Sequence, residues 1–223
     1  MSISQLTETH YRMLKDRAIS DEFIVARGVR SVEADEAVEK YGFSPWQRFS
    51  GLLIPTWGMD REIKGCQIRP DRPRIDKKGR PIKYESPWKQ RNALDMNPLM
   101  QEVIRKMDAA IWITEGSLKG DSMGSRGFPA IALTGVWGWR GRNEAGGYTA
   151  LPDWEDVSIR GSRFVIAFDS DISTNKQVAE SARRLKDYLL YKKADLVKFL
   201  ILPSRGTEKV GVDDYLASIP KGR

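Results

Sequence analysis

Residues 163–171 read RFVIAFDSD, an apolar run that ends in two carboxylates two positions apart. The run 164–168 is uniformly apolar, which is typical of a strand that is buried on both faces of a sheet. Asp169 and Asp171 follow it directly. Because residues two apart in an extended chain point to the same side, both carboxylates can face one point. The stretch therefore predicts a buried strand that brings two acidic side chains to an edge of the sheet.

From about residue 98 onward, short apolar runs alternate with segments of helical periodicity. The apolar runs are 110–114, 130–135, 164–168 and 196–202, and the helical segments are 97–110, 117–127 and 175–193. Strands that are apolar throughout and alternate with helices predict a parallel sheet with both faces covered. The expected fold class is α/β, with a parallel sheet flanked by helices and α+β character over the whole chain.

Two of the helical segments carry apolar residues at helical spacing. In the first, Leu99, Val103 and Met107 share one face. In the last, the apolar stripe comprises Val178, Ala182, Leu185 and Leu189. These stripes predict the sides on which the two helices meet other parts of the chain.

The first 97 residues predict a smaller, basic α+β subdomain. Residues 20–28 and 31–42 each begin at a serine suited to capping a helix and end at a glycine suited to ending one. Residues 51–58 and 63–70 are short β-type runs bounded by Gly and Pro. We place the boundary so that the basic subdomain is 1–97 and the domain with the parallel sheet is 98–223.

The chain has 223 residues, of which 40% are hydrophobic, and it can bury a substantial core. Its single cysteine, Cys66, and single histidine, His10, exclude a disulfide framework and a Cys/His zinc site built from this chain alone. We expect Cys66 to be a small buried residue and His10 to lie on the surface of a helix. No apolar run approaches the roughly 18–20 residues of a membrane span, and the N-terminal segment lacks the apolar core of a signal peptide. A cytoplasmic protein without membrane contact is expected.

The acidic residues that follow the predicted strands suggest a metal site. Ligands of open α/β sheets bind beyond the carboxyl ends of the strands, where Glu115, Asp169 and Asp171 stand. If the two strands are neighbours, three carboxylates converge there, and they repel one another unless a cation lies between them. Oxygen ligands without His or Cys suit Mg²⁺ or Mn²⁺, completed by water and substrate phosphate. The alternative is that these residues only cap helices or form turns.

Positive charge points to a polyanionic partner. The formal net charge is +7, although such an excess can also serve only to keep a protein soluble. Residues 69–91 are rich in Arg, Lys and Pro and predict an exposed loop or hairpin. Their candidates for binding a single-stranded backbone are Arg69, Arg72, Arg74, Lys77, Lys78, Arg80 and Lys83, with Tyr84 and Trp88 able to stack on bases. The alternative is a solvated basic loop.

A second group of candidates follows the run 130–135. Trp137 and Trp139 could offer a stacking platform beside Arg140 and Arg142. The alternative is that the two tryptophans are buried and seal a long loop.

No Gly-rich loop with a Walker-type lysine is present, which excludes a helicase motor in this sequence.

The acidic motifs resemble the Toprim domain of DnaG-type primases, topoisomerases and some nucleases. They are most similar to the Toprim-like domains of plasmid, phage and integrative-element replication proteins. The matching stretches are 112–156, 163–185 and 209–217. Upstream, residues 51–87 are similar to the basic region that precedes Toprim in primases, including the element KYESP at 83–87. The resemblance covers the chain from about residue 20 to 217.

The resemblance implies a primase-like nucleotidyltransferase core that makes short primers on single-stranded DNA from nucleoside triphosphates by two-metal phosphoryl transfer. Glu115 would be the acid beside the reacting phosphate, and Asp169 and Asp171 the metal-binding pair. Asp213 and Asp214 would support a second metal, although they also suit an ordinary helix N-terminus.

Lys119 departs from the family pattern, because many Toprim proteins have an acidic residue at this position. A lysine cannot ligate a metal but could hold a triphosphate, which fits nucleotide transfer better than cleavage. The alternatives are a Toprim nuclease and a non-catalytic nucleic-acid-binding module of a replication complex. A helicase or a zinc-binding module in the same complex is a further expected partner.

Overall fold

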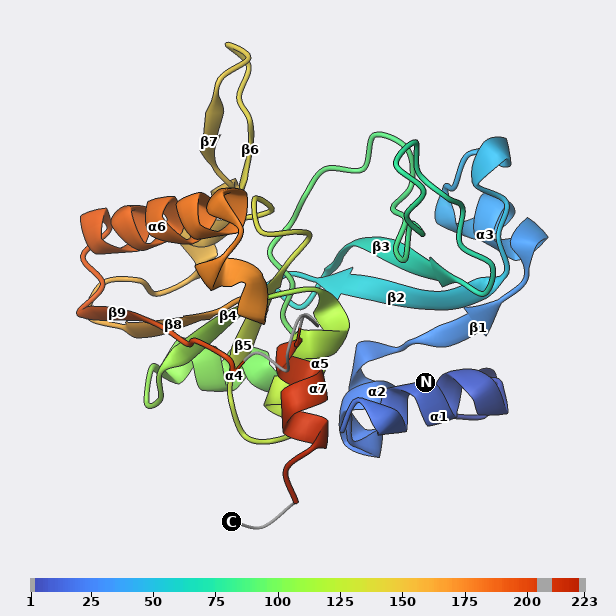
Figure 1. Ribbon diagram of the computed structural model, residues 1–223, viewed down its shortest axis with the longest axis horizontal. Coiled ribbons are helices and arrows are strands. Elements are labelled where there is room, and N and C mark those ends of the chain that lie inside the picture. Colours follow the sequence, from blue (N-terminus) through green and yellow to red (C-terminus); the bar gives the residue numbers. More distant parts are fainter. Residues whose placement is uncertain (1–2, 204–209, 221–223) are drawn as a thin grey trace.

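A four-stranded parallel sheet forms the centre of the second half of the chain (Figure 1). The computed structural model describes residues 3–203 and 210–220. The strands, in the spatial order β5-β4-β8-β9, are β5 (Ala130–Leu133), β4 (Ile111–Glu115), β8 (Arg163–Ala167) and β9 (Leu196–Phe199). The stretch 163–171 therefore begins as an inner strand, with β4 on one side and β9 on the other. The predicted α/β class with a parallel sheet is confirmed.

Helices cover both faces of this sheet. They are α4 (Pro98–Lys106), α5 (Ser117–Gly124), α6 (Lys176–Tyr191) and α7 (Val212–Ala217). Ile113 and Ile166 belong to the cluster that includes Leu185 of α6. Ala167, the next residue along β8, belongs to the cluster that includes Val212 of α7. Successive strand residues thus meet opposite layers, as the alternation of side chains in a strand requires.

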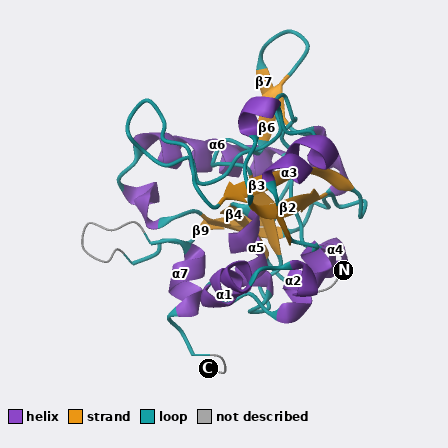
Figure 2. Cartoon of the chain, turned by 90° about the vertical axis from the view of Figure 1, so that its right-hand side faces the viewer, coloured by secondary structure: helices purple, strands orange, loops and turns teal. Residues whose placement is uncertain are grey.

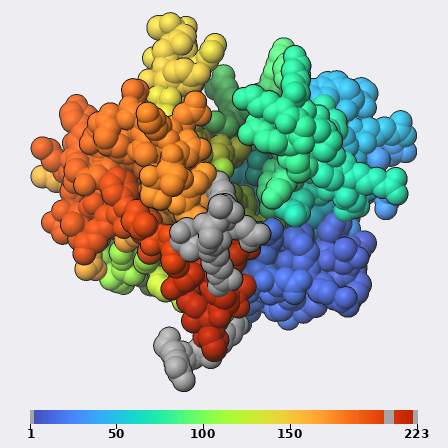
Figure 3. Space-filling view, viewed as in Figure 1, coloured from blue at the N-terminus to red at the C-terminus, as the bar shows by residue number. Residues whose placement is uncertain are grey.

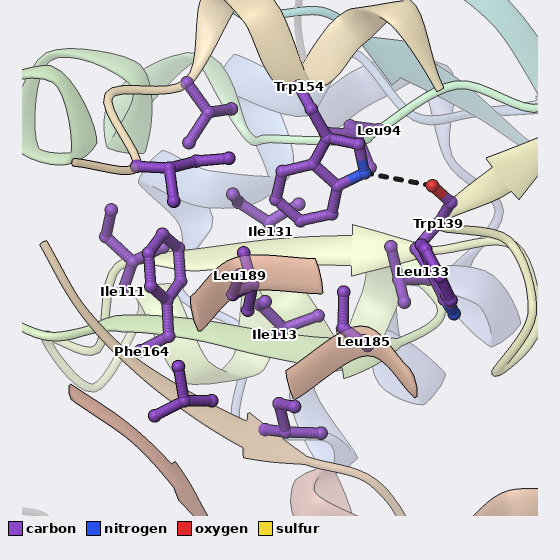
Figure 4. Packing of buried hydrophobic residues seen from close by; sticks show 14 of the residues in the cluster. Leu94, Ile111, Ile113, Ile131, Leu133, Trp139, Trp154, Phe164, Leu185 and Leu189 are labelled. Carbon is purple, nitrogen blue, oxygen red and sulfur yellow. Dashed lines mark hydrogen bonds between the residues drawn. The ribbon is translucent and has the colours of Figure 1, made fainter. Parts of the chain in front are cut away.

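The apolar stripe of α6 packs on the sheet as predicted. Its four residues Val178, Ala182, Leu185 and Leu189 are all buried. Figure 4 shows Leu185 and Leu189 beside Ile113 and Phe164 of the strands. Trp154 closes the same cluster, and its indole N–H donates a hydrogen bond to the carbonyl of Trp139 at 2.9 Å. Full burial of such side chains stabilises the fold by about 1.5–3 kcal/mol each.

Helix α4 exists as predicted, but its apolar stripe is exposed. Leu99, Val103 and Met107 have exposed fractions of 41%, 38% and 42%. The helix instead buries Gln101 and Ile104. The Gln101 side-chain amide donates a hydrogen bond to the carbonyl of Gly58 at 2.7 Å, which satisfies a polar group in the interior. The spacing of apolar residues predicted the helix correctly. Its buried side is set by contact with a distant segment that includes Gly58.

The first half of the chain contains a three-stranded antiparallel sheet in the order β1-β2-β3. Its strands and helices are α1 (Glu8–Asp16), α2 (Asp21–Arg27), β1 (Arg30–Val32), α3 (Ala34–Tyr41), β2 (Gly51–Trp57) and β3 (Ile63–Pro70). The 3-10 turns of the molecule are η1 (Ile3–Gln5), η2 (Pro45–Gln47), η3 (Pro152–Asp156) and η4 (Ser170–Ser173). The expected helices and strands of residues 20–70 are present, with one difference in their limits.

The difference concerns the helix expected from Ser31. This residue lies in β1, and the helix begins at Ala34 after Glu33. The Ser31 hydroxyl accepts a hydrogen bond from the Thr7 backbone N–H at 2.8 Å and lies 2.7 Å from His10 Nδ1. Serine is thus used for a contact between segments, which a capping pattern cannot distinguish from a helix start.

His10 is not a surface residue, contrary to the sequence-based expectation. It is 7% exposed, and its Nε2 lies 2.8 Å from the carboxylate of Asp71. Two polar partners satisfy its ring, so burial is tolerated.

Cys66 is buried as expected. Residues 71–80 are mostly exposed and lie outside the regular strands, which confirms the loop predicted there.

The two halves of the chain share interior contacts. Leu118 of α5 packs in a cluster with residues of the first half, such as Phe23 and Leu52. Arg27 is buried and forms ion pairs with Asp95 at 2.5 Å and Asp121 at 2.6 Å. The boundary between 97 and 98 remains a prediction about autonomous folding.

None of the described helices is long and apolar enough to cross a membrane.

A short hairpin that the sequence did not predict follows β5. It consists of β6 (Arg140–Arg142) and β7 (Tyr148–Ala150), paired antiparallel. Figures 1 and 2 both show it projecting beyond the rest of the fold. It leaves the sheet at the carboxyl end of β5, which is the edge where the acidic residues stand.

Candidate active site

Glu115 is the last residue of β4, and the chain turns sharply after it into α5. Gly116 makes this turn with φ of 94°, a conformation that side-chain-bearing L residues rarely adopt. A Cβ atom at this position would meet nothing within 4 Å, so the backbone angle, and not lack of space, requires glycine. The Glu-Gly pair therefore has a local cause: it ends a strand and starts a helix within one residue.

Asp169 stands at the same edge of the sheet as Glu115. Strands β4 and β8 are neighbours, with Thr114 opposite Ala167, as the sequence analysis required. Asp169 is 5% exposed and occupies the N-cap position of η4. The predicted meeting of the two strand ends is therefore present.

Asp171 does not share the extended backbone that the sequence analysis assumed. It lies inside η4, where its carbonyl accepts hydrogen bonds from the N–H groups of Thr174 and Asn175. Alternation of side chains applies to strands and not to a 3-10 turn. Spacing therefore does not place Asp169 and Asp171 on one side, because the chain turns immediately after Asp169.

Lys119 provides positive charge at this edge. Its Nζ lies 2.5 Å from Oδ1 of Asp169, and both side chains are largely buried, with exposed fractions of 19% and 7%. Lys119 is one turn into α5, so the turn at Gly116 brings its side chain back over the strand ends. Charge-assisted hydrogen bonds of this kind are short and strong. The lysine thus neutralises a carboxylate that would otherwise be buried at a cost.

The oxygen donors at this edge are of the type that a hard divalent cation uses, although within the described residues they form no cage of three. Within residues 3–203 and 210–220, no three Asp, Glu, His or Cys side chains are arranged as a metal cage. Mg²⁺ commonly uses one or two carboxylates and completes its shell with water and substrate phosphates. Glu115 and Asp169 supply that type of ligand. The chemistry of the donors fits, and the roles of Glu115, Asp169 and Asp171 as ligands remain predictions.

Asp213 and Asp214 lie in the first turn of α7. Asp213 is 1% exposed and forms an ion pair with Arg17. The carboxylate of Asp214 accepts a hydrogen bond from the backbone N–H of Gly211 at 3.2 Å. This geometry favours the alternative that they form a helix N-terminus, with Asp213 also tying α7 to the first half of the chain.

A pocket of about 370 Å³ opens beside Glu115. It is lined by Arg17, Gln67, Tyr84, Glu115, Gly116, Leu118, Lys119, Leu133, Thr134 and Gly135. Both halves of the chain contribute to it. The pocket combines cations, a carboxylate and an aromatic ring, a set that suits a phosphate-bearing ligand with a planar group.

Arg17, Gln67 and Thr134 were missed by the sequence analysis. Arg17 and Gln67 reach the pocket because the first half packs against the second, whereas Thr134 follows β5, which pairs with β4 beside Glu115. Trp88, a predicted stacking residue, is exposed, and its ring lies edge to face with that of Trp46, which the sequence analysis missed, with centroids 5.9 Å apart. Two large exposed aromatic residues in a polar region were the available signal.

Most basic residues of the segment 69–91 are exposed, but Arg69 is half-buried in β3 and two others are neutralised within the segment. Arg74 pairs with Glu85 at 2.6 Å, and Arg80 pairs with Asp76 at 2.9 Å. Arg69 donates a hydrogen bond to the Tyr84 hydroxyl at 3.1 Å. Of the predicted binding residues, Arg72, Lys77, Lys78 and Lys83 are exposed and form no ion pair with another described residue. Their role in binding nucleic acid remains a prediction.

Of the two tryptophans predicted after β5 as a stacking platform, Trp139 follows the buried alternative, whereas Trp137 is half-buried and its role remains a prediction. Trp139 is 6% exposed and packs in the main core, where its indole N–H donates to the Ser181 hydroxyl at 3.3 Å. The Trp137 ring carries the Arg140 guanidinium 3.8 Å from its centroid. Burial removes Trp139 as a stacking surface, and the arginine covers a face of Trp137.

Comparisons with known proteins identify a family and a fold. Residues 99–221 match a family described as "Domain of unknown function (DUF3854)". No curated protein matches the sequence. Among solved structures, the fold is similar to the zinc-binding and RNA polymerase domains of the Aquifex aeolicus primase, with a TM-score of 0.63 and 15% identity. It is also similar to a DnaG catalytic core, with a TM-score of 0.61 and 15% identity.

Each likeness includes both halves of the chain, because it covers 94% of it. The chain spans 52% of the Aquifex aeolicus structure and 67% of the DnaG core, so it corresponds to part of each. At this identity the likeness establishes a common fold. The mixed α/β architecture described above is that of a primase catalytic core.

Proposed function

Because the chain belongs to the DUF3854 family of unknown function and has the fold of a primase catalytic core, we propose that it is a primase-like nucleotidyltransferase. Its substrates would be nucleoside triphosphates, and its template single-stranded DNA. It would make short primers in the replication of a plasmid, phage or other mobile element. A helicase or zinc-binding module would act with it in the same complex.

The observation that carries this proposal is the joint construction of the pocket by both halves of the chain. A Toprim-type sheet alone would suit a nuclease or a topoisomerase equally well. Here the fold likeness extends over the basic first half, and Arg17 and Tyr84 from that half line the same pocket as Glu115 and Lys119. Cleavage and polymerisation both need acidic residues that hold a metal, but polymerisation also needs a pocket for the incoming nucleotide beside them.

The residues of the pocket suit phosphoryl transfer, which requires positioning and charge neutralisation more than covalent chemistry. Lys119 and Arg17 would bind phosphate oxygens, and the Tyr84 ring would contact the base. Without substrate, Lys119 forms an ion pair with Asp169. A bound triphosphate would replace Asp169 as the anion that contacts Lys119. Mg²⁺ or Mn²⁺, held by Glu115 and Asp169, would neutralise the charge that develops on the transferred phosphate.

The first test is incorporation of labelled nucleoside triphosphates on single-stranded DNA with Mg²⁺ or Mn²⁺. We expect short labelled products from the wild type and a loss of at least about 100-fold in Asp169→Asn, because a neutral amide cannot balance a cation at this edge. The matched control is Asp187→Asn, which alters an exposed carboxylate on α6. Circular dichroism and thermal melting would establish that both variants fold.

The outcomes separate the alternatives. Labelled products that vanish in Asp169→Asn but persist in Asp187→Asn support the transferase. Shortening of the DNA template without labelled products would instead support a nuclease. Wild-type turnover by a folded Asp169→Asn protein would overturn the proposed site.

A further inference from the structure

The β6–β7 hairpin presents a chain of arginine and aromatic side chains. The Arg140 guanidinium lies over the Trp137 ring at 3.8 Å and over the Tyr148 ring at 4.7 Å from the centroids. Arg142 lies over the Tyr148 ring at 5.7 Å, and Arg184 of α6 lies 6.0 Å from the Trp137 centroid. Cation–π contacts of this kind are attractive and orient the guanidinium plane. The hairpin thus holds its cations in defined positions.

The two hairpin arginines are not neutralised by carboxylates of the described chain. The ion pairs nearby on α6 join Arg183 and Arg184 to Glu180, and neither Arg140 nor Arg142 takes part in such a pair. The loop 69–91 differs, because Arg74 and Arg80 there have carboxylate partners. A hydrogen bond from Arg142, together with its charge, lowers the pKa of the Tyr148 hydroxyl. The hairpin turn also carries one exposed carboxylate, Glu144, which forms no ion pair with either arginine, so the hairpin keeps a net positive charge.

The position of the hairpin relates it to the candidate active site. It leaves the carboxyl end of β5, and β5 pairs directly with β4, which ends in Glu115. Figure 3 shows the hairpin, in yellow, standing clear of the neighbouring surface, with a hollow between it and the green segment of the first half. A long polymer that occupies the site and extends past this edge would meet the hairpin.

The chemistry of the hairpin selects the backbone of a nucleic acid over its bases. A guanidinium stacked on a ring keeps N–H groups in its plane that match phosphate oxygens. In Arg140 these are the terminal N–H groups, because its Nε is buried. The rings of Trp137 and Tyr148 already carry arginines, so these faces are not offered to unpaired bases. A duplex needs no such stacking, since its bases stack on each other, and it carries a denser phosphate charge than a single strand.

We infer that the β6–β7 hairpin binds the phosphodiester backbone of duplex nucleic acid through Arg140 and Arg142, and thereby holds the template–primer product as it leaves the site. The inference rests on the proposed function for the identity of the duplex. Such contacts with the backbone do not depend on the nucleotide sequence, and the affinity of the protein for the duplex should fall steeply as the salt concentration rises.

The test measures binding of a fluorescent 16-base-pair duplex by anisotropy over a series of salt concentrations, in EDTA and without nucleotides. In Arg140→Gln/Arg142→Gln we expect an affinity about tenfold lower and a log–log salt slope smaller by about 2, because two phosphate contacts are lost. The matched control is Arg160→Gln/Arg163→Gln, which removes the same charge from two exposed arginines at the opposite edge of the sheet. The single variant Arg142→Gln, at an exposed position, guards against misfolding of the hairpin and should reduce the slope by about 1.

Equal affinity and slope in the wild type and a folded hairpin variant would overturn the inference. A loss seen with single-stranded DNA but not with the duplex would also overturn it. An equal loss in the Arg160/Arg163 control would show that only net charge matters, with the same consequence. Because no catalysis is measured, failure of primer synthesis leaves this result intact, and failure of this test leaves the proposed activity open to its own assay.

Discussion

At the scale of single residues, the effect of burial depends on whether a partner is present. Asp169 is buried at the end of a central strand, but the Lys119 ammonium beside it compensates for the lost water. Cys66 is buried in β3 without a charged partner, and its Sγ lies 4.0 Å from the carbonyl of Tyr41. Burial raises the pKa of the Cys66 thiol to about 11. The buried carboxylate has a cationic partner, whereas burial without one keeps the thiol protonated and unreactive.

The raised pKa of Cys66 predicts a loss of stability in alkali. Above its ordinary pKa of 9.0 the thiol of the unfolded chain loses its proton, whereas the folded chain keeps it up to about 11. The contribution is therefore fully present below pH 9 and is lost as the pH rises to 11. Between pH 8.5 and 10.5 the free energy of unfolding should fall by about 2 kcal/mol more in the wild type than in Cys66→Ala. Urea denaturation at both pH values measures this, and identical pH dependence of the two proteins would contradict it.

At the scale of elements, helical spacing identifies a helix more safely than it identifies the buried side. In α6 the apolar stripe faces the sheet, because the helix lies directly over the strands. In α4 the apolar stripe remains exposed, and Ile104 and Gln101 are buried in its place. The difference arises because the interior contact of α4 includes the backbone of Gly58, which needs a polar donor. An apolar stripe shows that a helix is amphipathic. Which side of the helix is buried depends on the segment that packs against it.

Two neighbouring residues of α4 should therefore respond very differently to truncation. Ile104 is fully buried, and Ile104→Ala should lower the free energy of unfolding by about 2–5 kcal/mol. Val103 is 38% exposed, and Val103→Ala should change it by no more than about 0.5 kcal/mol. Both variants remove aliphatic carbons from the same helix, so each serves as the control of the other in urea denaturation. Equal costs would mean that the exposed stripe has a partner in solution.

At the scale of the whole molecule, a buried ionic cluster connects the two halves. Arg27 of α2 contacts Asp121 of α5 and Asp95 in the connecting segment, and all three side chains are buried. Burial pushes the pKa of Arg27 down, but the charges of Asp121 and Asp95 outweigh it and raise the pKa above its ordinary value. The guanidinium therefore stays charged, and the carboxylates depend on it.

Removal of this cation should destabilise both halves together. We expect Arg27→Met to lower the free energy of unfolding by about 3–5 kcal/mol, because it leaves buried carboxylates without a cation. Arg183→Met, which breaks an exposed ion pair with Glu180, should cost at most about 1 kcal/mol. Hydrogen exchange should show reduced protection in β2 and in β4 alike. Loss confined to one sheet would mean that residues 1–97 and 98–223 fold independently.

The sequence alone was sufficient for the features that depend on local pattern. The four parallel strands, helix α6, the exposed loop 71–80 and the arrival of Glu115 and Asp169 at one edge all follow from runs and spacing. These features are encoded within a few residues, because a buried strand must be apolar and a turn must admit glycine.

The tertiary structure determined which side chains meet. Lys119 reaches Asp169 across 50 positions, and Arg17 reaches Asp213 across 196. Asp171 lies in a 3-10 turn, against the expectation from spacing, and burial of Trp139 decides between the two alternatives that the sequence left open. Contacts between such distant positions depend on how strands and halves pack, and no local period contains that information. The sheet edge was therefore predictable, whereas the charges and rings that give it a pocket and a hairpin surface were not.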